Sequence, residues 1–339
     1  MKRFLFSISL LLLLFSCKQK ANKINSAFYY WKTVYDLDST DVKNLKNNHF
    51  NILYLRLFDV DWDGVKNTPM PKATLQFNSD PDTGLQIVPV IYITQTCLKK
   101  LSLDSVKILG GLIAQKANAI CKVFHINYNQ IQIDADWTES TKDKYFALLT
   151  EVKKAQEGKR ILSCTIRLHQ IKFPEKTGVP PIDRGMLMFY NMGELSQINE
   201  ENSIYNEKTA TQYTDHIDRY KLPLDMALPH FSWGILYRGK KVAAILNGLK
   251  KENLDNPFFM KQENNWYTVK ASTTWGSNDL HAGDRIRLET ADENTCKDAW
   301  AFLKLHQKSD SFTLTFFDLK PKTNEKTFQD LYHIAHSSD

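Results

Sequence analysis

Several motifs that would assign a function at once are missing from this sequence of 339 residues. It contains no phosphate-binding P-loop, no dinucleotide-binding glycine fingerprint and no G-x-S-x-G nucleophile turn. Its basic residues are scattered, without a stripe or interleaved aromatic residues, so nucleic acid is not an expected partner. Internal repeats and low-complexity linkers are also missing after residue 26. These absences speak against nucleotide-dependent enzymes and nucleic-acid-binding modules.

Cysteine is scarce, with five residues in all, and the sequence contains no recognisable metal site. Beyond the amino-terminal segment the cysteines are Cys97, Cys121, Cys164 and Cys296. Their spacing matches no zinc pattern, and export would permit disulfides without selecting a pairing. The run from Asp59 to Gly64 resembles the opening of a calcium loop, but Met70 occupies the position of the closing glutamate. We therefore expect no bound metal and no cofactor.

The apolar run over residues 4–15 is too short to span a bilayer comfortably. It follows Lys2 and Arg3 and ends at Ser16 and Cys17, which is typical of a bacterial lipoprotein signal peptide covering residues 1–17. A simple secretory signal and an uncleaved anchor are the alternatives. We expect acyl chains on Cys17 to hold the mature chain to a bacterial membrane in the cell envelope, and we expect this to be the outer membrane. Residues 18–26 are then a polar tether.

Residues 27–339 alternate between strand and helix patterns, which predicts an α/β fold. The strand candidates are residues 27–31, 51–58, 85–93, 130–136, 160–168, 185–191, 223–230 and 312–318. Helical patterns separate most of them, and the clearest cover residues 39–48, 102–120, 208–220 and 325–335. This alternation predicts a single (β/α)₈ barrel.

A small β-rich insertion, at about residues 231–291, is expected between the seventh and eighth strands. It contains Trp233, Tyr237, Trp266 and Trp275. These aromatic residues can stack on sugar rings or form a small core of their own, and we favour the second use.

The strand over residues 130–136 is the most informative part of the chain. Its alternation places Gln132, Asp134 and Asp136 on one face, although a strand buried on both sides should be apolar throughout. Active sites of such barrels lie at the carboxyl ends of the strands. The sequence therefore predicts a site at Asp134 and Asp136, against the alternative of a structural ion pair with an arginine.

Other polar residues follow neighbouring strands and are expected to converge on the same end. The candidates for substrate binding are Arg56, Asp59, Asp61, Trp137, Arg167, His169 and Asn191. Arginine beside a carboxylate holds it ionised and orients it. A histidine at a strand end is more often a hydrogen-bonding residue than a catalytic one.

Asp134-Ala135-Asp136 resembles the acidic signature of chitinase-like glycoside hydrolases, and Met188-Phe189-Tyr190-Asn191 is similar to their sixth-strand motif. The resemblance implies that Asp136 orients an acetamido group, that Tyr190 bonds its carbonyl and that Asp134 tunes Asp136. It also departs from the family, because Thr138 occupies the position of the general-acid glutamate. The family's acid after the tyrosine is likewise replaced, by Asn191.

Candidates for the missing proton donor are Glu139, Asp61 and Glu194. With Glu139 included, the expected catalytic group is Asp134, Asp136, Glu139 and Tyr190.

A closer resemblance covers almost the whole mature chain. Residues 28–33, 58–63, 133–141 and 166–170 are similar to a family of bacterial lipoproteins with a TIM-barrel domain. It implies a barrel held to a membrane through a lipid anchor. Three hypotheses follow: a glycoside-hydrolase-like enzyme acting on a glycan or peptidoglycan fragment, a binding barrel that has lost its acid, and a structural lipoprotein of an envelope complex. The sequence does not indicate an oligomeric state.

Overall fold

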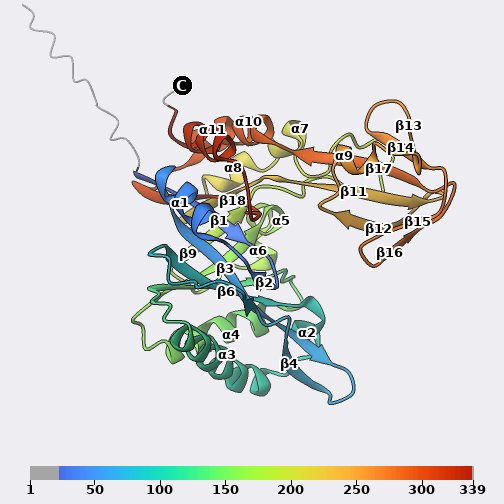
Figure 1. The fold of residues 1–339 in the computed structure, drawn as a ribbon. Coiled ribbons are helices and arrows are strands. Elements are labelled where there is room, and N and C mark those ends of the chain that lie inside the picture. Colours follow the sequence, from blue (N-terminus) through green and yellow to red (C-terminus); the bar gives the residue numbers. More distant parts are fainter. Residues whose placement is uncertain (1–22, 338–339) are drawn as a thin grey trace, which may run out of the picture.

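The computed structural model describes residues 23–337, and within them eight parallel strands close into a barrel (Figure 1). The barrel strands are β1 (Lys23–Tyr30), β3 (Phe50–Asp63), β6 (Gln86–Ile93), β7 (Gln130–Ala135), β8 (Ile161–Arg167), β9 (Arg184–Met188), β10 (Leu224–Pro229) and β18 (Ser311–Phe317). Each strand pairs in parallel with the next, and β18 pairs with β1 to complete the ring. The predicted (β/α)₈ barrel is therefore confirmed.

Helices surround the barrel and supply the outer half of its core. The longer ones are α1 (Ser39–Asn47), α3 (Leu103–Val123), α4 (Lys142–Ala155), α10 (Glu293–Leu303) and α11 (Glu325–His336). α3 and α4 lie along one side and α10 and α11 along the opposite side (Figure 1). In α3 the buried residues Val106, Leu109, Ile113 and Ala117 recur every three or four positions, so one face packs on the strands.

Shorter elements connect these parts. The short helices are α2 (Gln95–Lys100), α5 (Leu168–Lys172), α6 (Pro174–Thr177), α7 (Glu207–Ala210), α8 (Thr214–Ile217), α9 (Lys251–Leu254) and a 3₁₀ turn (Lys304–His306). β2 (Val34–Tyr35) pairs with β5 (Gln76–Phe77). None of the described helices is long and apolar enough to cross a membrane.

Three local expectations were wrong. The helix expected over residues 208–220 is two short helices, α7 and α8. The segment around Pro69 and Pro71, which is not among the expected strands, contains β4 (Thr68–Lys72), which pairs antiparallel with an extension of β3. β1 begins at Lys23 and pairs with β18 from its first residue, so the expected tether of residues 18–26 is partly a barrel strand.

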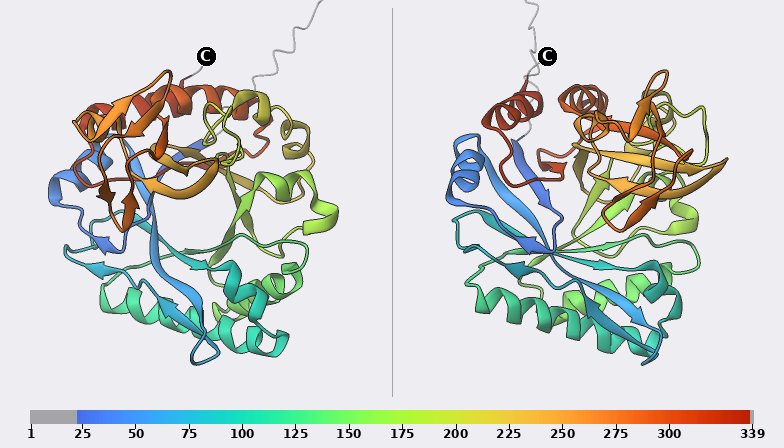
Figure 2. Two further views of the ribbon diagram at one scale, coloured as in Figure 1. Left: turned by 90° about the vertical axis from the view of Figure 1, so that its right-hand side faces the viewer. Right: turned by 45° about the vertical axis from the view of Figure 1, so that its right-hand side comes forward.

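A five-stranded sheet rises from the barrel between β10 and β18. It consists of β11 (Phe231–Arg238), β12 (Lys241–Asn247), β13 (Phe259–Lys261), β14 (Trp266–Val269) and β17 (Arg285–Ala291), and beside it lies the hairpin of β15 (Thr273–Trp275) and β16 (Asn278–Leu280). Gly239 has a φ of +63° in the turn between β11 and β12, a conformation that glycine adopts without steric cost. This insertion projects from the same end of the barrel as the β3–β4 hairpin, and the left view of Figure 2 looks toward that end.

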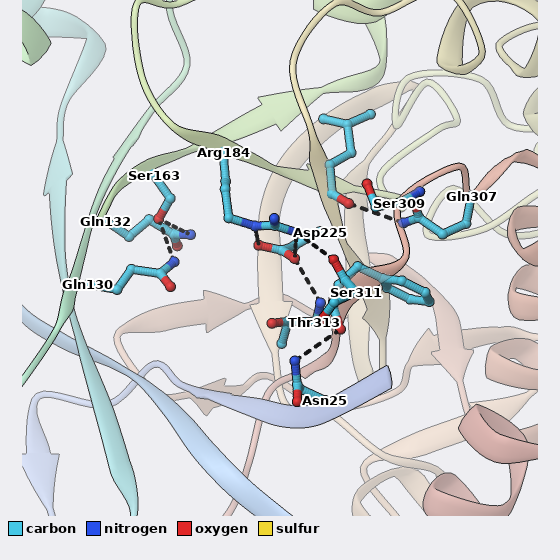
Figure 3. A network of polar contacts seen from close by, with 12 residues as sticks. Asn25, Gln130, Gln132, Ser163, Arg184, Asp225, Gln307, Ser309, Ser311 and Thr313 are labelled. Atoms are coloured by element: carbon cyan, nitrogen blue, oxygen red, sulfur yellow. Dashed lines mark hydrogen bonds and ion pairs between the residues drawn. The ribbon is translucent and has the colours of Figure 1, made fainter. Parts of the chain in front are cut away.

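The opposite end of the barrel is closed by a network of polar contacts (Figure 3). Arg184 forms two hydrogen bonds with the buried carboxylate of Asp225, at 2.7 and 3.0 Å, and Asp225 also accepts the backbone N–H of Thr313 at 2.7 Å. Next to them Gln130 and Gln132 both donate to the hydroxyl of Ser163. Because these partners satisfy one another at the amino-terminal ends of the strands, this network is structural.

Candidate functional site

A cavity of about 610 Å³ lies at the carboxyl ends of the strands, beneath the insertion. We call it the mouth cavity. Its aromatic lining residues are Trp31, Tyr92, Tyr190, Phe231, Trp233 and Phe317. Its charged lining residues are Lys32, Arg56, Asp134, Asp136, Arg167, Asp318 and Lys320. Aromatic rings and converging polar groups in one concave pocket are typical of a ligand-binding site, and this cavity is more highly charged than most.

Asp134, Asp136 and Arg167 form the charged floor of the mouth cavity. Asp134 is on β7, which alternates so that Asp134 points into the barrel, and Asp136 follows directly after the strand. Arg167 ends the neighbouring strand β8. Its Nε donates to Oδ1 of Asp136 at 2.6 Å, and its Nη2 lies 3.8 Å from Oδ1 of Asp134. The guanidinium of Arg167 therefore interacts with both carboxylates.

The two carboxylates differ in their exposure to water. Asp134 is buried and accepts a hydrogen bond from the hydroxyl of Thr165 at 2.5 Å. Burial raises the pKa of Asp134 above its usual value, an effect that Arg167 partly opposes. The side chain of Asp136 is 44% exposed and faces the cavity. Asp136 is thus the carboxylate that a ligand can reach.

We expect Asp134→Asn to gain stability relative to wild type as the pH rises. A carboxyl whose pKa is raised by folding stabilises the folded state most below its unfolded pKa, and this stability is lost as pH rises through the folded pKa. An asparagine side chain cannot ionise, so the Asp134→Asn variant does not lose stability in this way as the pH rises. Thermal unfolding midpoints of wild type and variant, measured between about pH 3 and about pH 8, test this expectation, and Asp104→Asn at an exposed position is the control. A midpoint difference that stays constant with pH contradicts the expectation.

Two tyrosines place hydroxyl groups near this floor. Tyr190 follows β9, and its hydroxyl donates to the sulfur of Met188 at 3.1 Å. Burial raises the pKa of Tyr190 above its usual range, and burial with the nearby Asp136 raises the pKa of Tyr92 to about 12. Both phenols therefore keep their protons at neutral pH. Tyr190 can donate to a ligand in exchange for its weak hydrogen bond to the sulfur of Met188.

Arg56 also reaches the mouth cavity, but its charge is compensated locally. Its Nε donates to Asp59 at 2.8 Å, a second guanidinium nitrogen bonds the other carboxylate oxygen, and the guanidinium lies 5.3 Å from the ring centroid of Trp31. Asp59 does not line the cavity. Its role is therefore to hold Arg56 rather than to contact a ligand.

A smaller side cavity of about 350 Å³ adjoins the mouth cavity and shares Asp136, Arg167, Tyr190 and Asn191 with it. Its other lining residues include Thr138 and His169. Loss of hydration lowers the pKa of the His169 imidazole, although Asp136 acts in the opposite direction. The two cavities together form a groove that crosses the mouth with Asp136 and Arg167 at its centre.

Four of the predicted catalytic or substrate-binding residues lie outside this groove: Asp59, Asp61, Trp137 and Glu139. Trp137 is fully buried behind the barrel wall, where its indole N–H donates to the carbonyl of Thr177 at 3.0 Å and its ring stacks on Tyr145. The expectation that Trp137 binds substrate was therefore wrong. Glu139 is exposed in the turn that follows and lines neither cavity.

Asp61 lies on the extension of β3 that pairs with β4, beyond the end of the barrel. Hydrogen bonds from Lys72 at 2.8 Å and Thr94 at 2.6 Å lower its pKa to about 2. Because its oxygens are already occupied and it lines neither cavity, Asp61 is placed as a structural residue of the hairpin.

The structure adds lining residues that the sequence argument did not identify. Trp31 and Lys32 follow β1, whereas Asp318 and Lys320 follow β18. The signal was present, because the rule that sites form at strand carboxyl ends applies to the first and eighth strands as well. Trp233 of the insertion also lines the cavity, while Tyr237 is buried and Trp266 packs on it at 5.2 Å.

Within residues 23–337, no group of three or more histidine, cysteine, aspartate or glutamate side chains is placed to hold a metal ion. The cysteines at 97, 121, 164 and 296 are free and buried in the described structure. Burial raises the pKa of the Cys97 and Cys121 thiols to about 12, so they are inert core residues.

The same fold occurs in solved structures of glycan-degrading enzymes. A chitinase from Chromobacterium violaceum matches with a TM-score of 0.56 and 9% identity, over 93% of this chain and 99% of that chain. The spore cortex-lytic enzyme SleL of Bacillus cereus matches with 0.56 and 11%, over 93% and 74%. A class V chitinase from Pseudomonas fluorescens matches with 0.54 and 11%, over 92% and 98%. At such identities the likeness shows a shared fold.

No protein-family model matches the sequence, and no curated protein is similar enough in sequence to match it.

Proposed function

We propose that this barrel binds an N-acetylated glycan in the groove across its mouth without hydrolysing it. The observation that carries the proposal is the pairing of a solvent-facing Asp136 with Arg167, beside Tyr190, in a groove that contains Thr138 at the acid position. The resemblance to chitinases suggests how the site is used. Asp136 accepts the acetamido N–H, and the Tyr190 hydroxyl donates to its carbonyl oxygen.

The aromatic lining supports a sugar ligand. The rings of Trp31, Tyr92, Phe231 and Trp233 border the cavity, and aromatic faces offer apolar area with few rotatable bonds. The shared fold with two chitinases and a cortex-lytic enzyme is consistent with this ligand class.

Hydrolysis requires a proton donor beside the leaving oxygen, and each candidate is placed unfavourably. Glu139 is exposed outside the groove, and Asp61 is bonded to Lys72 and Thr94. Glu194 is exposed and accepts hydrogen bonds from Ser196 and Gln197. Among the described residues that line the two cavities there is no glutamate. Binding without cleavage is therefore the function that this arrangement supports best.

The test is to titrate wild type with chitin oligosaccharides and peptidoglycan fragments, and to measure released reducing ends in the same samples. We expect a rise in the unfolding midpoint with bound fragment and no release above that of buffer. Release of reducing ends by wild type would replace the binding hypothesis with the enzyme hypothesis. A midpoint that no fragment shifts would leave only the structural-lipoprotein hypothesis.

We also propose that the chain is a lipoprotein held to a bacterial membrane through Cys17, a residue that lies outside the described part of the structure. The support is the lipobox-like sequence at residues 14–17 behind an apolar run. Cys17→Ala is expected to abolish incorporation of a labelled fatty acid and to release the protein from membranes. Unchanged labelling in that variant would exclude Cys17 as the lipid attachment site.

A further inference from the structure

The charge of the mouth cavity is divided between its floor and its rim. On the floor, Arg167 faces both Asp134 and Asp136, so positive charge does not exceed negative charge there. The charge of Arg56 is compensated by Asp59. On the rim, Lys32 and Lys320 face a single carboxylate, Asp318.

Asp318 forms an ion pair with Lys32. Its Oδ2 lies 3.6 Å from Nζ of Lys32, and its side chain is only 11% exposed. Within the described residues, Lys320 makes no side-chain hydrogen bond and no ion pair within 4.0 Å. Lys320 is therefore a cation beside the cavity without a close counter-charge.

A neighbouring cavity adds a third lysine. This rim cavity, of about 620 Å³, shares Phe231, Ser232, Asp318 and Lys320 with the mouth cavity. Its remaining charged lining is mixed, because Lys250, Lys251 and Lys322 lie there together with Glu252, Asp292 and Glu293, the last of which is paired with His230. Of these lysines, Lys250 is the one that acts on Lys320. Partial burial lowers the pKa of Lys320, and Lys32 and Lys250 lower it further, while Asp318 acts in the opposite direction. An anion placed among the three lysines would relieve this repulsion.

We propose that Lys320, with Lys32 and Lys250, forms an anion subsite at the rim, which selects glycans that carry a negatively charged substituent. This inference rests on the proposed glycan-binding function and names its substrate class. The acetamido group then occupies the floor at Asp136, and an anionic group on the same or the next sugar lies at the rim. Lysine suits this task because its ammonium group is a point charge that accepts an anion from several directions.

A carboxylate is the chemistry we assign to the substituent, and two sources of it are separable by experiment. One is the lactyl group of an N-acetylmuramic acid residue, and the other is a uronic acid alternating with an N-acetylated sugar. Both place a single negative charge within one sugar of an acetamido group. The insertion borders the rim and limits how far a glycan can extend there. The distance between the acetamido group and the carboxylate on the glycan therefore decides which of the two sources fits.

The experiment compares three fragments by isothermal titration: neutral triacetylchitotriose, an N-acetylglucosamine–N-acetylmuramic acid oligomer with free lactyl carboxylates, and a hyaluronan tetrasaccharide. We expect wild type to bind at least one acidic fragment roughly tenfold more tightly than the neutral one at low salt. This preference should largely disappear at about 0.5 M salt, where screening acts over a few ångströms.

Two variants test the assignment to Lys320. Lys320→Met should bring the ratio of acidic to neutral affinity close to one, and Lys320→Glu should make the neutral fragment the tighter ligand. Lys107→Met removes an equal charge from the outer helix α3, where Lys107 pairs with the exposed Asp104 at 3.8 Å, and should keep the wild-type ratio.

The outcomes separate the two proposals. A wild-type ratio near one with clear binding of chitotriose would overturn the anion subsite and leave glycan binding intact. A ratio that Lys320→Met leaves unchanged would also overturn it. If none of the three fragments binds, glycan binding itself fails and the subsite fails with it.

Discussion

Glu289→Gln is expected to destabilise the protein by about 3–5 kcal/mol, the largest effect of any single substitution we predict. Glu289 and Arg287 are neighbours on one face of the insertion sheet, with 0% and 1% of their side chains exposed, and they form an ion pair of 2.7 Å. The other oxygen of Glu289 accepts hydrogen bonds from Ser203 and from the indole of Trp233. The amide would leave the guanidinium buried without its counter-charge.

The measurement is urea unfolding of wild type and variant, with the free energy of unfolding taken from the midpoint and slope. Asp330→Asn is the matched control, because Asp330 pairs with Lys326 on the exposed face of α11 and should cost less than about 0.5 kcal/mol. The double variant Arg287→Met/Glu289→Gln should recover part of the loss, since it leaves no unpaired charge. Equal costs for Glu289→Gln and Asp330→Asn would contradict the buried-pair argument.

This ion pair also connects the insertion to the site. Ser203 belongs to the barrel segment after β9, whereas Trp233 lines the mouth cavity from the insertion. Glu289 bonds both, so it fixes the position of one wall of the cavity relative to the barrel. The sequence did not reveal this role, because the alternation of β17 shows which residues share a face but not which loop covers that face.

The barrel and its floor could be predicted because period-2 alternation determines which way a side chain points. The same rule correctly applied would have excluded Trp137. Asp134 and Asp136 point toward the mouth, so the residue between them and the residue after them point to the helices, where Trp137 stacks on Tyr145. Proximity to a motif in the sequence was a poorer guide than strand geometry.

The hairpin of β3 and β4 explains the misplacement of Asp61. The sequence predicted that the second strand ends at residue 58, but β3 continues to Asp63 and pairs with a segment that contains Pro69 and Pro71. Proline is tolerated there because β4 is an edge strand and needs no hydrogen bond on its outer side. Because the second strand was expected to end at residue 58, Asp59 and Asp61 were predicted to lie at the mouth, whereas they belong to the hairpin.

Asp136→Asn is expected to weaken glycan binding roughly 10- to 100-fold while costing about 1 kcal/mol of stability or less. Its carboxylate is half-exposed, so the fold gains little from its charge. Arg167 keeps Asp134 at 3.8 Å when the charge of Asp136 is removed, which prevents an uncompensated buried guanidinium. A ligand that donates an acetamido N–H to Asp136 loses a charge-assisted hydrogen bond.

Thermal unfolding and titration of the two proteins with the same chitin and peptidoglycan fragments measure both effects. Asp61→Asn is the matched control, because it removes a carboxylate from the hairpin outside the groove and should bind fragments as wild type does. If Asp136→Asn binds fragments as well as wild type does, Asp136 is not a ligand contact. If Asp136→Asn instead loses about 3–5 kcal/mol of stability, Asp136 and Arg167 are a structural ion pair. The carboxylate of Asp136 would then stabilise the fold and would not be a binding group for a ligand.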